Sequence, residues 1–501
     1  MDLNLHVLLP EIVVSAAALL AVAADLLSPT ARRAGVVPAV AGAGLLVAFL
    51  FLLQGRNEGR ETAVLGHFVS DAFSRFARAL ATGGGLLLVG LSAGYTRRMD
   101  RGHGEFYGLL LLALTGVMLV SGVSDLMSLF VSLELITVMS YVLAAFRRND
   151  ATSTEAGLKY LVIGAVSSAI LLFGIALVYG AAGTVDFGPL SAHVAGKGAS
   201  PLLSLGTALI LGGLFFKASA VPFQVWAPDV YQGAPTPVTA FLSSLSKSAG
   251  FVLLLRVMQV LIVPGAGAAG AQAWIGFLGV VAAATLLYGN LGAIPQRNVK
   301  RLLAYSSIGH AGYMLRGVAA IAAAPTPEMR VGATAAVLFY LLAYYLTTVT
   351  AFSVVALVSA EGAGHEAGTA YRGLSRRSPF LALCMLLALL SLAGVPPMAG
   401  LIGKLLVFYE VVRVAGTHPA LYAAALIGAV GVVISLYYYL LLIREIYAKA
   451  PATEAPLRPI PVASRLVLVV GILAMVGLGL YWRNAYDAAT EAAQALFPAG
   501  R

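Results

Sequence analysis

Long apolar runs follow one another along almost the whole of this 501-residue chain, and they constrain its fold more than any other feature. Each run fills a window of about 20 residues, the length that an α-helix needs to cross a bilayer. Hydrophobic residues make up 60% of the sequence and charged residues only 11%, against about 25% charged in an ordinary soluble domain. The pattern predicts an all-α polytopic membrane protein. It excludes a soluble domain and a disordered chain, and it argues against a repeat solenoid.

Charged residues, proline and glycine divide the apolar runs into about fourteen transmembrane helices. We place these spans at residues 5–27, 36–53, 71–95, 105–122, 125–146, 157–181, 202–223, 237–262, 274–294, 302–322, 331–359, 379–413 with a break, 420–445 and 464–482.

Lysine and arginine alternate in register with these spans. Cytoplasmic connections of membrane proteins retain basic residues, and the odd-numbered connections hold 17 of them. The even-numbered connections and the C-terminal tail hold seven, namely Arg56, Arg60, Lys197, Arg330, Arg413, Arg483 and Arg501. The alternation predicts that both termini are non-cytoplasmic. It also assigns the net charge of +10 to membrane topology, since no basic tail or patch indicates nucleic-acid binding.

Motifs for bound cofactors are scarce. The single cysteine, Cys384, has no partner for a disulfide, and no His and Cys spacing matches a zinc or iron-sulfur site. Only His310 lies well inside an apolar run, so a second histidine to hold a haem is missing. The stretch from Gly400 to Lys404 is too short for a phosphate-binding loop. We therefore expect no cofactor and no metal in this chain, and an energy source in a gradient or a partner.

Proline is expected to break two of the helices. One break surrounds Pro222 in the seventh span, and the other surrounds Pro396 in the twelfth, 174 residues later. Transporters often place broken helices at matching positions of duplicated halves. Because a block of five spans reverses its orientation when it is repeated, the spacing predicts two inverted five-helix repeats, although two unrelated proline kinks are the alternative. The predicted parts are three N-terminal helices at 1–104, a first repeat at 105–262, a second repeat at 274–445, and a C-terminal helix with its tail at 446–501.

Four ionisable residues lie deep within the spans. Lys217 precedes the first break, Lys404 follows the second, and Lys247 is near the middle of its span. Glu134 is the one carboxylate near the middle of the fifth span. A charge at this depth costs a few kcal/mol, so such residues indicate function by default. We predict that they form a proton relay, with serines such as Ser306 and Ser307 helping to hold water.

Other charged residues within the spans have simpler alternatives. Lys159 is near the start of its span and can reach the interface with its long side chain. Arg256 and Arg316 are expected to be structural, and His310 is either an interior histidine with satisfied hydrogen bonds or a relay near Lys247. A surface or interfacial position is expected for Arg75, Arg78, Glu410 and Arg413.

Three stretches of the sequence resemble a known family. The stretches FKASAVPFQVWAPDVYQGAPTPVTAFLSSLSKSAGF, RLLAYSSIGHAGYML and SLAGVPPMAGLIGK are similar to the subunit N family of bacterial NADH-quinone oxidoreductase, respiratory complex I. The resemblance covers the whole chain. It implies an antiporter-like subunit with fourteen helices, two inverted five-helix repeats, and proton translocation coupled to quinone reduction elsewhere in the complex.

The resemblance also implies roles for individual residues. The family's glutamate of the fifth helix falls on Glu134, and its lysines of the sixth, seventh, eighth and twelfth helices fall on Lys159, Lys217, Lys247 and Lys404. In this reading Glu134 tunes Lys159, and the other lysines relay protons across the centre of the membrane.

Two positions depart from the family pattern. Gln224 stands where members often have histidine, so we do not expect an essential titrating group there. Arg316 stands where an apolar residue is expected.

The sequence thus predicts a proton-translocating membrane-arm subunit of NADH-quinone oxidoreductase in the bacterial inner membrane. Other membrane subunits and lipid are the expected partners of this chain. NADH, FMN, iron-sulfur clusters and quinone are expected in partner subunits of the complex. Two alternatives stay open: a subunit of a multi-subunit sodium/proton antiporter, and a scaffold that does not pump.

Overall fold

The computed structural model describes residues 4–54, 61–99, 101–198, 200–265, 269–359, 367–416, 418, 420–451 and 457–498. Its α-helices are α1 (Leu9–Leu27), α2 (Thr30–Gln54), α3 (Ala72–Thr96), α4 (His103–Leu119), α5 (Leu126–Ala144), α6 (Ala151–Ala182), α7 (Phe187–Lys197), α8 (Pro201–Ala218), α9 (Trp226–Gly233) and α10 (Thr236–Ser243). They continue with α11 (Leu245–Val257), α12 (Ala269–Ala293), α13 (Val299–Ala323), α14 (Pro327–Ser359), α15 (Leu374–Arg377), α16 (Pro379–Ala393), α17 (Ala399–Ala415), α18 (Ala420–Tyr447), α19 (Val462–Leu480) and α20 (Arg483–Leu496). Short elements complete the fold: the 3-10 helices η1 (Leu5–Leu8), η2 (Val64–Gly66) and η4 (Gly368–Tyr371), the π-helix η3 (Met258–Ile262), and the antiparallel strands β1 (Glu61–Ala63) and β2 (Phe68–Ser70).

The prediction of an all-α polytopic membrane protein is confirmed. Within the described residues, eleven helices are long and apolar enough to cross a membrane. The three predicted spans missing from these eleven correspond to α4, to α13, and to α16 together with α17. Helices α4 and α16 have only 17 and 15 residues, and α13 includes the polar residues His310 and Arg316. The count of fourteen therefore stays a prediction.

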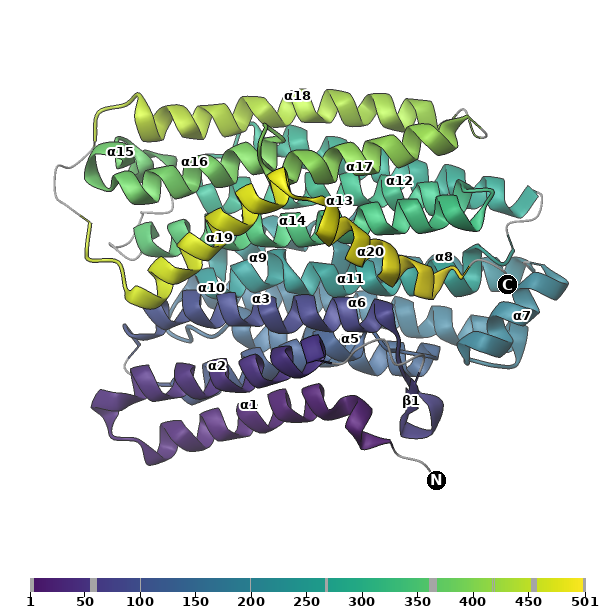
Figure 1. Cartoon of the computed structure of the whole chain (residues 1–501), viewed down its shortest axis with the longest axis horizontal. Helices are drawn as coiled ribbons and strands as arrows, with labels where there is room; N and C mark the ends of the chain where they lie inside the picture. The colour runs from purple at the N-terminus through teal and green to yellow at the C-terminus, as the bar shows by residue number, and fades with distance from the viewer. Residues whose placement is uncertain are drawn as a thin grey trace.

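The long helices lie roughly parallel to one another in a flat bundle (Figure 1). Helices α1 and α2 form one edge, α18 forms the other, and α19 and α20 cross one face of the bundle (Figure 1). The long helix α14 packs against α13, α16, α17 and α20 and is buried along most of its length. Both ends of the chain lie toward the end of the bundle where α7 and β1 are found (Figure 1).

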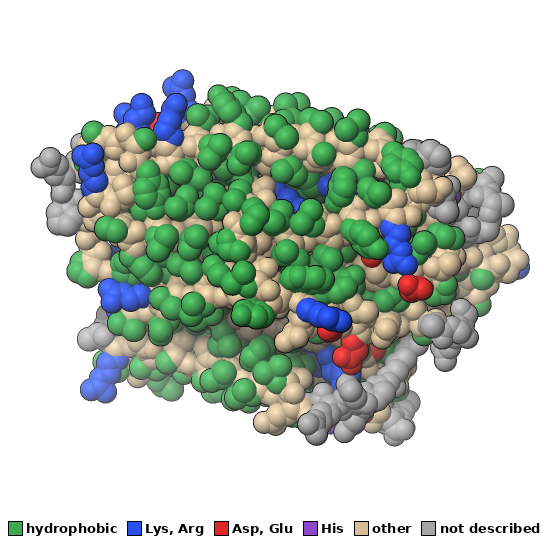
Figure 2. All heavy atoms as spheres, turned by 45° about the horizontal axis from the view of Figure 1, so that its top comes forward, with side chains coloured by type: hydrophobic (Ala, Val, Ile, Leu, Met, Phe, Trp, Pro, Cys, Tyr) green, Lys and Arg blue, Asp and Glu red, His purple; other side chains and the backbone are tan. Residues whose placement is uncertain are grey.

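Surface charge gathers at the ends of the bundle. Figure 2 shows a face covered mainly by hydrophobic side chains, with Lys and Arg side chains concentrated at its left end. This distribution agrees with the predicted alternation of basic connections. Three of the counted arginines, Arg56, Arg60 and Arg501, lie outside the described residues.

Both predicted helix breaks are confirmed. Helix α8 ends at Ala218, where Ser219 adopts a left-handed conformation with φ of 57°. Helix α16 ends at Ala393, where Gly394 has φ of 87° and the chain then passes through two prolines. A left-handed residue ends a helix, and a proline that follows disfavours its continuation because proline has no N–H to donate.

A third interruption was not predicted. The eighth span, expected to be continuous over 237–262, is divided between α10 and α11 at Ser244, whose φ and ψ are −116° and −88°. The hydroxyls of Ser243 and Ser244 both donate to the carbonyl oxygen of Ala240. Serine hydroxyls that bond back to the preceding turn bend helices. Lys247 therefore lies in the first turn of a new helix instead of the middle of a long one.

Candidate functional site

Three lysines are buried in the interior of the bundle, and each comes from a different helix. Lys217 on α8, Lys247 on α11 and Lys404 on α17 are exposed by only 2%, 1% and 6%. Their predicted burial is confirmed. Among the described residues, none of the three forms an ion pair with a carboxylate, and the Nζ atoms donate to neutral oxygen atoms.

Lys217 is held between hydroxyl groups of neighbouring helices. Its Nζ donates to Thr137 Oγ1 on α5 at 3.3 Å and to the Tyr160 hydroxyl on α6 at 3.4 Å. Tyr160 itself stacks on Trp226, with ring centroids 4.5 Å apart. Both hydroxyls were missed in the sequence, because a tyrosine or threonine in an apolar run usually packs in the core.

Lys247 contacts helix α13. Its Nζ donates to the carbonyl oxygen of Ser307 at 2.7 Å and also to the Ser307 hydroxyl. Helix α11 also approaches α8 closely, since a Cβ at Gly250 would lie 3.2 Å from the backbone carbonyl carbon of Lys217. The small residue one turn after Lys247 therefore brings the first and second buried lysines into neighbouring positions.

His310 is the centre of a buried hydrogen-bond cluster on α13. Its Nδ1 lies 2.8 Å from the Tyr340 hydroxyl on α14, and its Nε2 lies 3.3 Å from the Tyr439 hydroxyl on α18. The Tyr439 hydroxyl also shares a hydrogen bond with Ser306, which precedes the lysine-bound Ser307. The two tyrosines extend the predicted relay, and sequence reasoning did not find them.

Lys404 lies at the C-terminal end of α16, at the second helix break. Its Nζ donates to the carbonyl oxygens of Leu392 and Ala393 at 2.7 and 3.0 Å. These carbonyls belong to the last turn of α16, where backbone acceptors have no partner within the helix and a cation is favourable. The same Nζ lies 4.9 Å from the centre of the Tyr313 ring on α13. Helix α13 thus presents Ser307, His310 and Tyr313 at helical spacing between Lys247 and Lys404.

The structure does not bring Glu134 and Lys159 together. Glu134 is half-buried and accepts a hydrogen bond from Ser168 on α6. Lys159 is nine residues earlier on the same helix, about 13 Å along its axis. Its side chain is 42% exposed and pairs with Glu155 at 2.7 Å and with Asp229 at 2.8 Å. Glu134 and Lys159 therefore have different direct partners, and the expected tuning of Lys159 by Glu134 stays a prediction. Asp229 is a partner that the sequence did not reveal.

Asp229, beside the first helix break, forms ion pairs with a lysine of α6 and an arginine of α13. It lies on α9, where burial opposes its charge, yet Lys159 and Arg301 lower the pKa of the carboxyl below its usual value. Lys159 Nζ and Arg301 Nη1 each donate to one of its oxygens. The nearby Gln224 is buried, and its Oε1 has no hydrogen-bond partner among the described residues.

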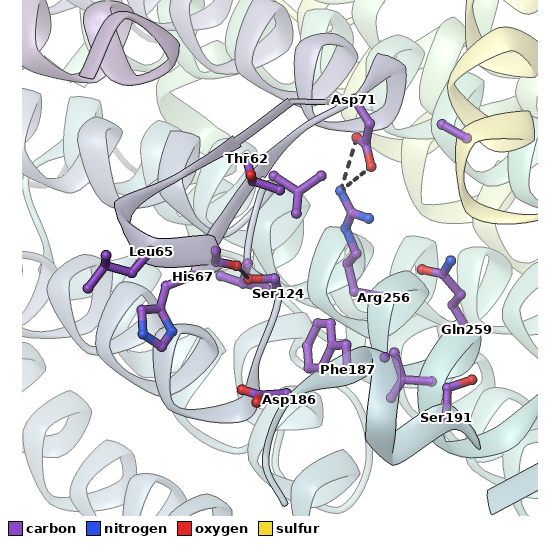
Figure 3. A pocket seen from close by; sticks show the side chains of 16 residues that line it. Thr62, Leu65, His67, Asp71, Ser124, Asp186, Phe187, Ser191, Arg256 and Gln259 are labelled. Carbon is purple, nitrogen blue, oxygen red and sulfur yellow. Dashed lines mark hydrogen bonds and ion pairs between the residues drawn. The ribbon is translucent and has the colours of Figure 1, made fainter. Parts of the chain in front are cut away.

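Two arginines of the spans form buried ion pairs. Arg78, expected at the interface, is instead buried against Glu11, with nitrogen to oxygen distances of 2.7 and 2.8 Å. Arg256, expected to be structural, donates to both oxygens of Asp71 at 3.0 and 2.9 Å. Figure 3 shows this second pair on the wall of a cavity of about 520 Å³ that His67 also lines. These pairs join helices that are far apart in the sequence.

The expected surface pair on α17 is only partly at the surface. Glu410 is buried, and Arg413, which is partly exposed, lies 3.6 Å from it and 3.1 Å from Glu328. No three His, Cys, Asp or Glu side chains within the described part of the chain are close enough together to hold a metal ion.

Comparison with known proteins gives the family. The profile of the family described as NADH:quinone oxidoreductase/Mrp antiporter, TM, matches residues 123–435. NADH-quinone oxidoreductase subunit N of Moorella thermoacetica is 41% identical over 481 residues, which cover 95% of this chain and 96% of the relative.

Solved structures agree with this relationship. A chain of respiratory complex I from Thermus thermophilus matches with a TM-score of 0.79 and 33% identity, over 96% of this chain and 100% of that chain. A chain of the Mrp complex from a Dietzia species shares the fold at a TM-score of 0.82, with 22% identity over 98% of this chain and 97% of that chain. Full-length similarity above 30% identity establishes that the chain belongs to the NADH-quinone oxidoreductase subunit N family.

Proposed function

We propose that this chain translocates protons as a membrane-arm subunit of NADH-quinone oxidoreductase, driven by quinone reduction in other subunits. The observation that supports this most directly is a buried line of side chains from α11, α13 and α17. It consists of Lys247, Ser307, His310 and Lys404. Buried cations without carboxylate partners are costly. A chain that keeps them in one interior line gains a path on which amine, imidazole and hydroxyl groups can pass protons.

The proposed path begins at Lys217, which the close contact at Gly250 brings next to the helix of Lys247. Hydroxyls of Ser306 and Tyr439 link that region to His310. Lys404, seated on the carbonyls of the α16 end, is the last group of the line.

Glu134 is placed to respond to a neighbour. It is half-buried on α5, where the outward-facing Val131 is exposed. We propose that another membrane subunit covers this face, so that events in that subunit reach Glu134. Lys159, through Asp229 on α9, offers a separate link to the first helix break.

The wider setting follows from the same proposal. The chain is assigned to the bacterial inner membrane with both termini outside the cytoplasm, and its inverted repeats occupy 105–262 and 274–445. The matching positions of the breaks after Ala218 and Ala393 support this duplication. NADH, FMN, iron-sulfur clusters and quinone are assigned to partner subunits.

Two substitutions at one lysine test the relay. The assembled oxidoreductase is reconstituted in liposomes, and NADH-driven acidification of the lumen is followed with a pH-sensitive dye. Lys247→Ala should lower proton pumping about tenfold or more, since a positioned proton-transfer group contributes about 100-fold or more to its step. Lys247→Arg should fail as well, because a guanidinium keeps its charge but does not release its proton.

Lys197→Ala, at an exposed lysine on α7, is the matched control and should pump normally. Normal pumping by Lys247→Ala, with the chain present in the purified complex, would leave the scaffold reading standing. Normal pumping by Lys247→Arg would show that only the charge is needed. A sodium gradient applied to the same liposomes tests the antiporter alternative, which predicts sodium-dependent proton movement without NADH.

A further inference from the structure

An open groove lies on the outer face of the bundle between α1, α4, α5 and α6. Its volume is about 870 Å³, and its walls are mainly aliphatic. Leu19, Val142 and Leu158 are among the lining residues that face outward. Gly108 and Gly157 line it as well, where the helices pack closely, since a Cβ would lie 3.0 Å from Val22 at the first position and 2.4 Å from Ala145 at the second.

One end of this groove continues into a polar pocket of about 660 Å³. The groove and the pocket share Glu105, Phe146 and Arg148, and the pocket adds Arg101 and Arg147. The junction lies where the α3–α4 and α5–α6 connections meet, at the end of the molecule that the basic connections mark.

The charges of the polar pocket leave an excess of cations. Arg147 is paired with Asp150 at 2.7 Å, and Asp150 also caps α6. Arg101 and Arg148 form no ion pair with a carboxylate in the described part of the chain. Glu105 faces the same space and offsets one of them. One uncompensated arginine charge therefore remains where the apolar groove opens.

The depth of the groove distinguishes a lipid from a protein helix. Its lining runs from Glu105 to Leu112 on α4 and from Thr154 to Leu161 on α6, about 10 Å along each helix. One leaflet of a bilayer is about 15 Å of hydrocarbon, whereas a spanning helix of another subunit would need about 30 Å. The groove is thus confined to one leaflet.

We infer that this groove binds an anionic glycerophospholipid of the leaflet at the basic end. An acyl chain lies along the aliphatic walls beside Leu158, and the phosphate lies against Arg101 and Arg148. Basic residues at a membrane surface attract anionic lipid by about 1 kcal/mol each. The site is independent of the proton path, because none of its lining residues belongs to the buried lysine line.

Lipid binding to the assembled complex tests this inference. The complex is placed in nanodiscs of phosphatidylcholine that contain a trace of fluorescent phosphatidylglycerol, and energy transfer from a donor dye on the complex reports binding. The double variant Arg101→Gln/Arg148→Gln should bind roughly 30-fold more weakly. Arg376→Gln/Lys449→Gln removes the same charge from exposed positions at the same end and should bind as the unchanged complex does.

A second pair of variants tests the apolar walls. Leu158→Trp should fill the groove and weaken binding without changing any charge. Val166→Trp is its control, on the same helix and similarly exposed at 57% against 60%, but outside the groove. Equal binding by the two arginine double variants would overturn the phosphate contact. Equal binding by the two tryptophan variants, or density for another subunit's helix in the groove, would overturn the site.

Discussion

At the scale of single residues, Arg316 is the position for which the sequence offered no explanation. Its guanidinium is buried, donates to the carbonyl oxygen of Ala424 at 3.2 Å, and lies 4.9 Å from the centre of the Tyr313 ring. Gly428 on α18 provides the space, because a Cβ there would lie 1.4 Å from Arg316 Nη1. Arg316 and Lys404 therefore both contact the ring of Tyr313. The arginine side chain fits only because residue 428 is glycine.

Replacing this glycine should displace the arginine. We expect Gly428→Ala to destabilise the chain by about 1–3 kcal/mol, the usual cost of overpacking a filled interior. The midpoint of heat-induced unfolding of the detergent-purified complex measures this. Arg316→Met combined with Gly428→Ala should recover part of the loss, since the shorter side chain leaves room.

Gly276→Ala on α12 is the control for the effect of a glycine-to-alanine change in a helix without a steric clash. No atom lies within 4 Å of the position that its Cβ would take, and alanine favours a helix over glycine by up to about 1 kcal/mol. Equal midpoints for the variants at 428 and 276 would contradict the explanation of Arg316.

Burial of the lysines deep in apolar runs could be predicted from the sequence, but the partners of buried charges could not. The position of a lysine within an apolar run indicates its depth in the membrane. Lysines far from both ends of a run, such as Lys247, are therefore expected to be buried, and they are. Pairs such as Arg78 with Glu11 or Lys159 with Asp229 join residues 67 and 70 positions apart. No local pattern records such contacts, so Arg78 was wrongly expected at the interface.

At the scale of helices, the breaks differ in how clearly the sequence indicates them. The breaks at Pro222 and Pro396 could be predicted, because a proline inside a helix removes a backbone hydrogen bond and kinks or ends the helix. The break at Ser244 depends on hydroxyls turning back to Ala240, a choice that serine makes only in some helices. Amphipathic helix α20 was also missed, since its packing on α14 and α3 comes from tertiary structure.

The α16–α17 break should be sensitive to one added methyl group. A Cβ at Gly400 would lie 1.9 Å from the carbonyl oxygen of Ser391, a backbone atom that cannot rotate away. Gly400→Ala should therefore separate the two half-helices and shift the carbonyls of Leu392 and Ala393 from Lys404. We expect a lower unfolding midpoint together with reduced proton pumping in liposomes.

The other end of the same helix offers a matched control. A Cβ at Gly416 would lie 3.9 Å from the nearest atom, the carbonyl oxygen of Arg413. Gly416→Ala should leave both measurements unchanged. If the two variants pump protons at the same rate, the hydrogen bonds from Lys404 to the α16 carbonyls have no part in the relay.

At the scale of the whole molecule, topology rests on the alternation of basic connections. The structure supports the pattern, with both chain ends at the end of α7 and β1 and with Lys and Arg gathered at the opposite end (Figures 1 and 2). Composition alone thus predicted the class of the protein, and the orientation of the chain in the membrane stays a prediction. The number of membrane crossings is harder to predict, because α4 and α16 are short and α13 includes polar residues.

Cysteine labelling tests both the orientation and the count. Cys384 is the chain's single cysteine and is fully buried, so Cys384→Ala gives a background without thiols in this chain. Asn149→Cys, on the α5–α6 connection, should react with a membrane-impermeant maleimide in inverted vesicles. Lys197→Cys, at the end of α7, should react only in right-side-out vesicles. The reverse pattern would invert the topology. Labelling of both from the same side would contradict a single crossing by α6, and with it the alternation of basic connections that places both termini outside the cytoplasm.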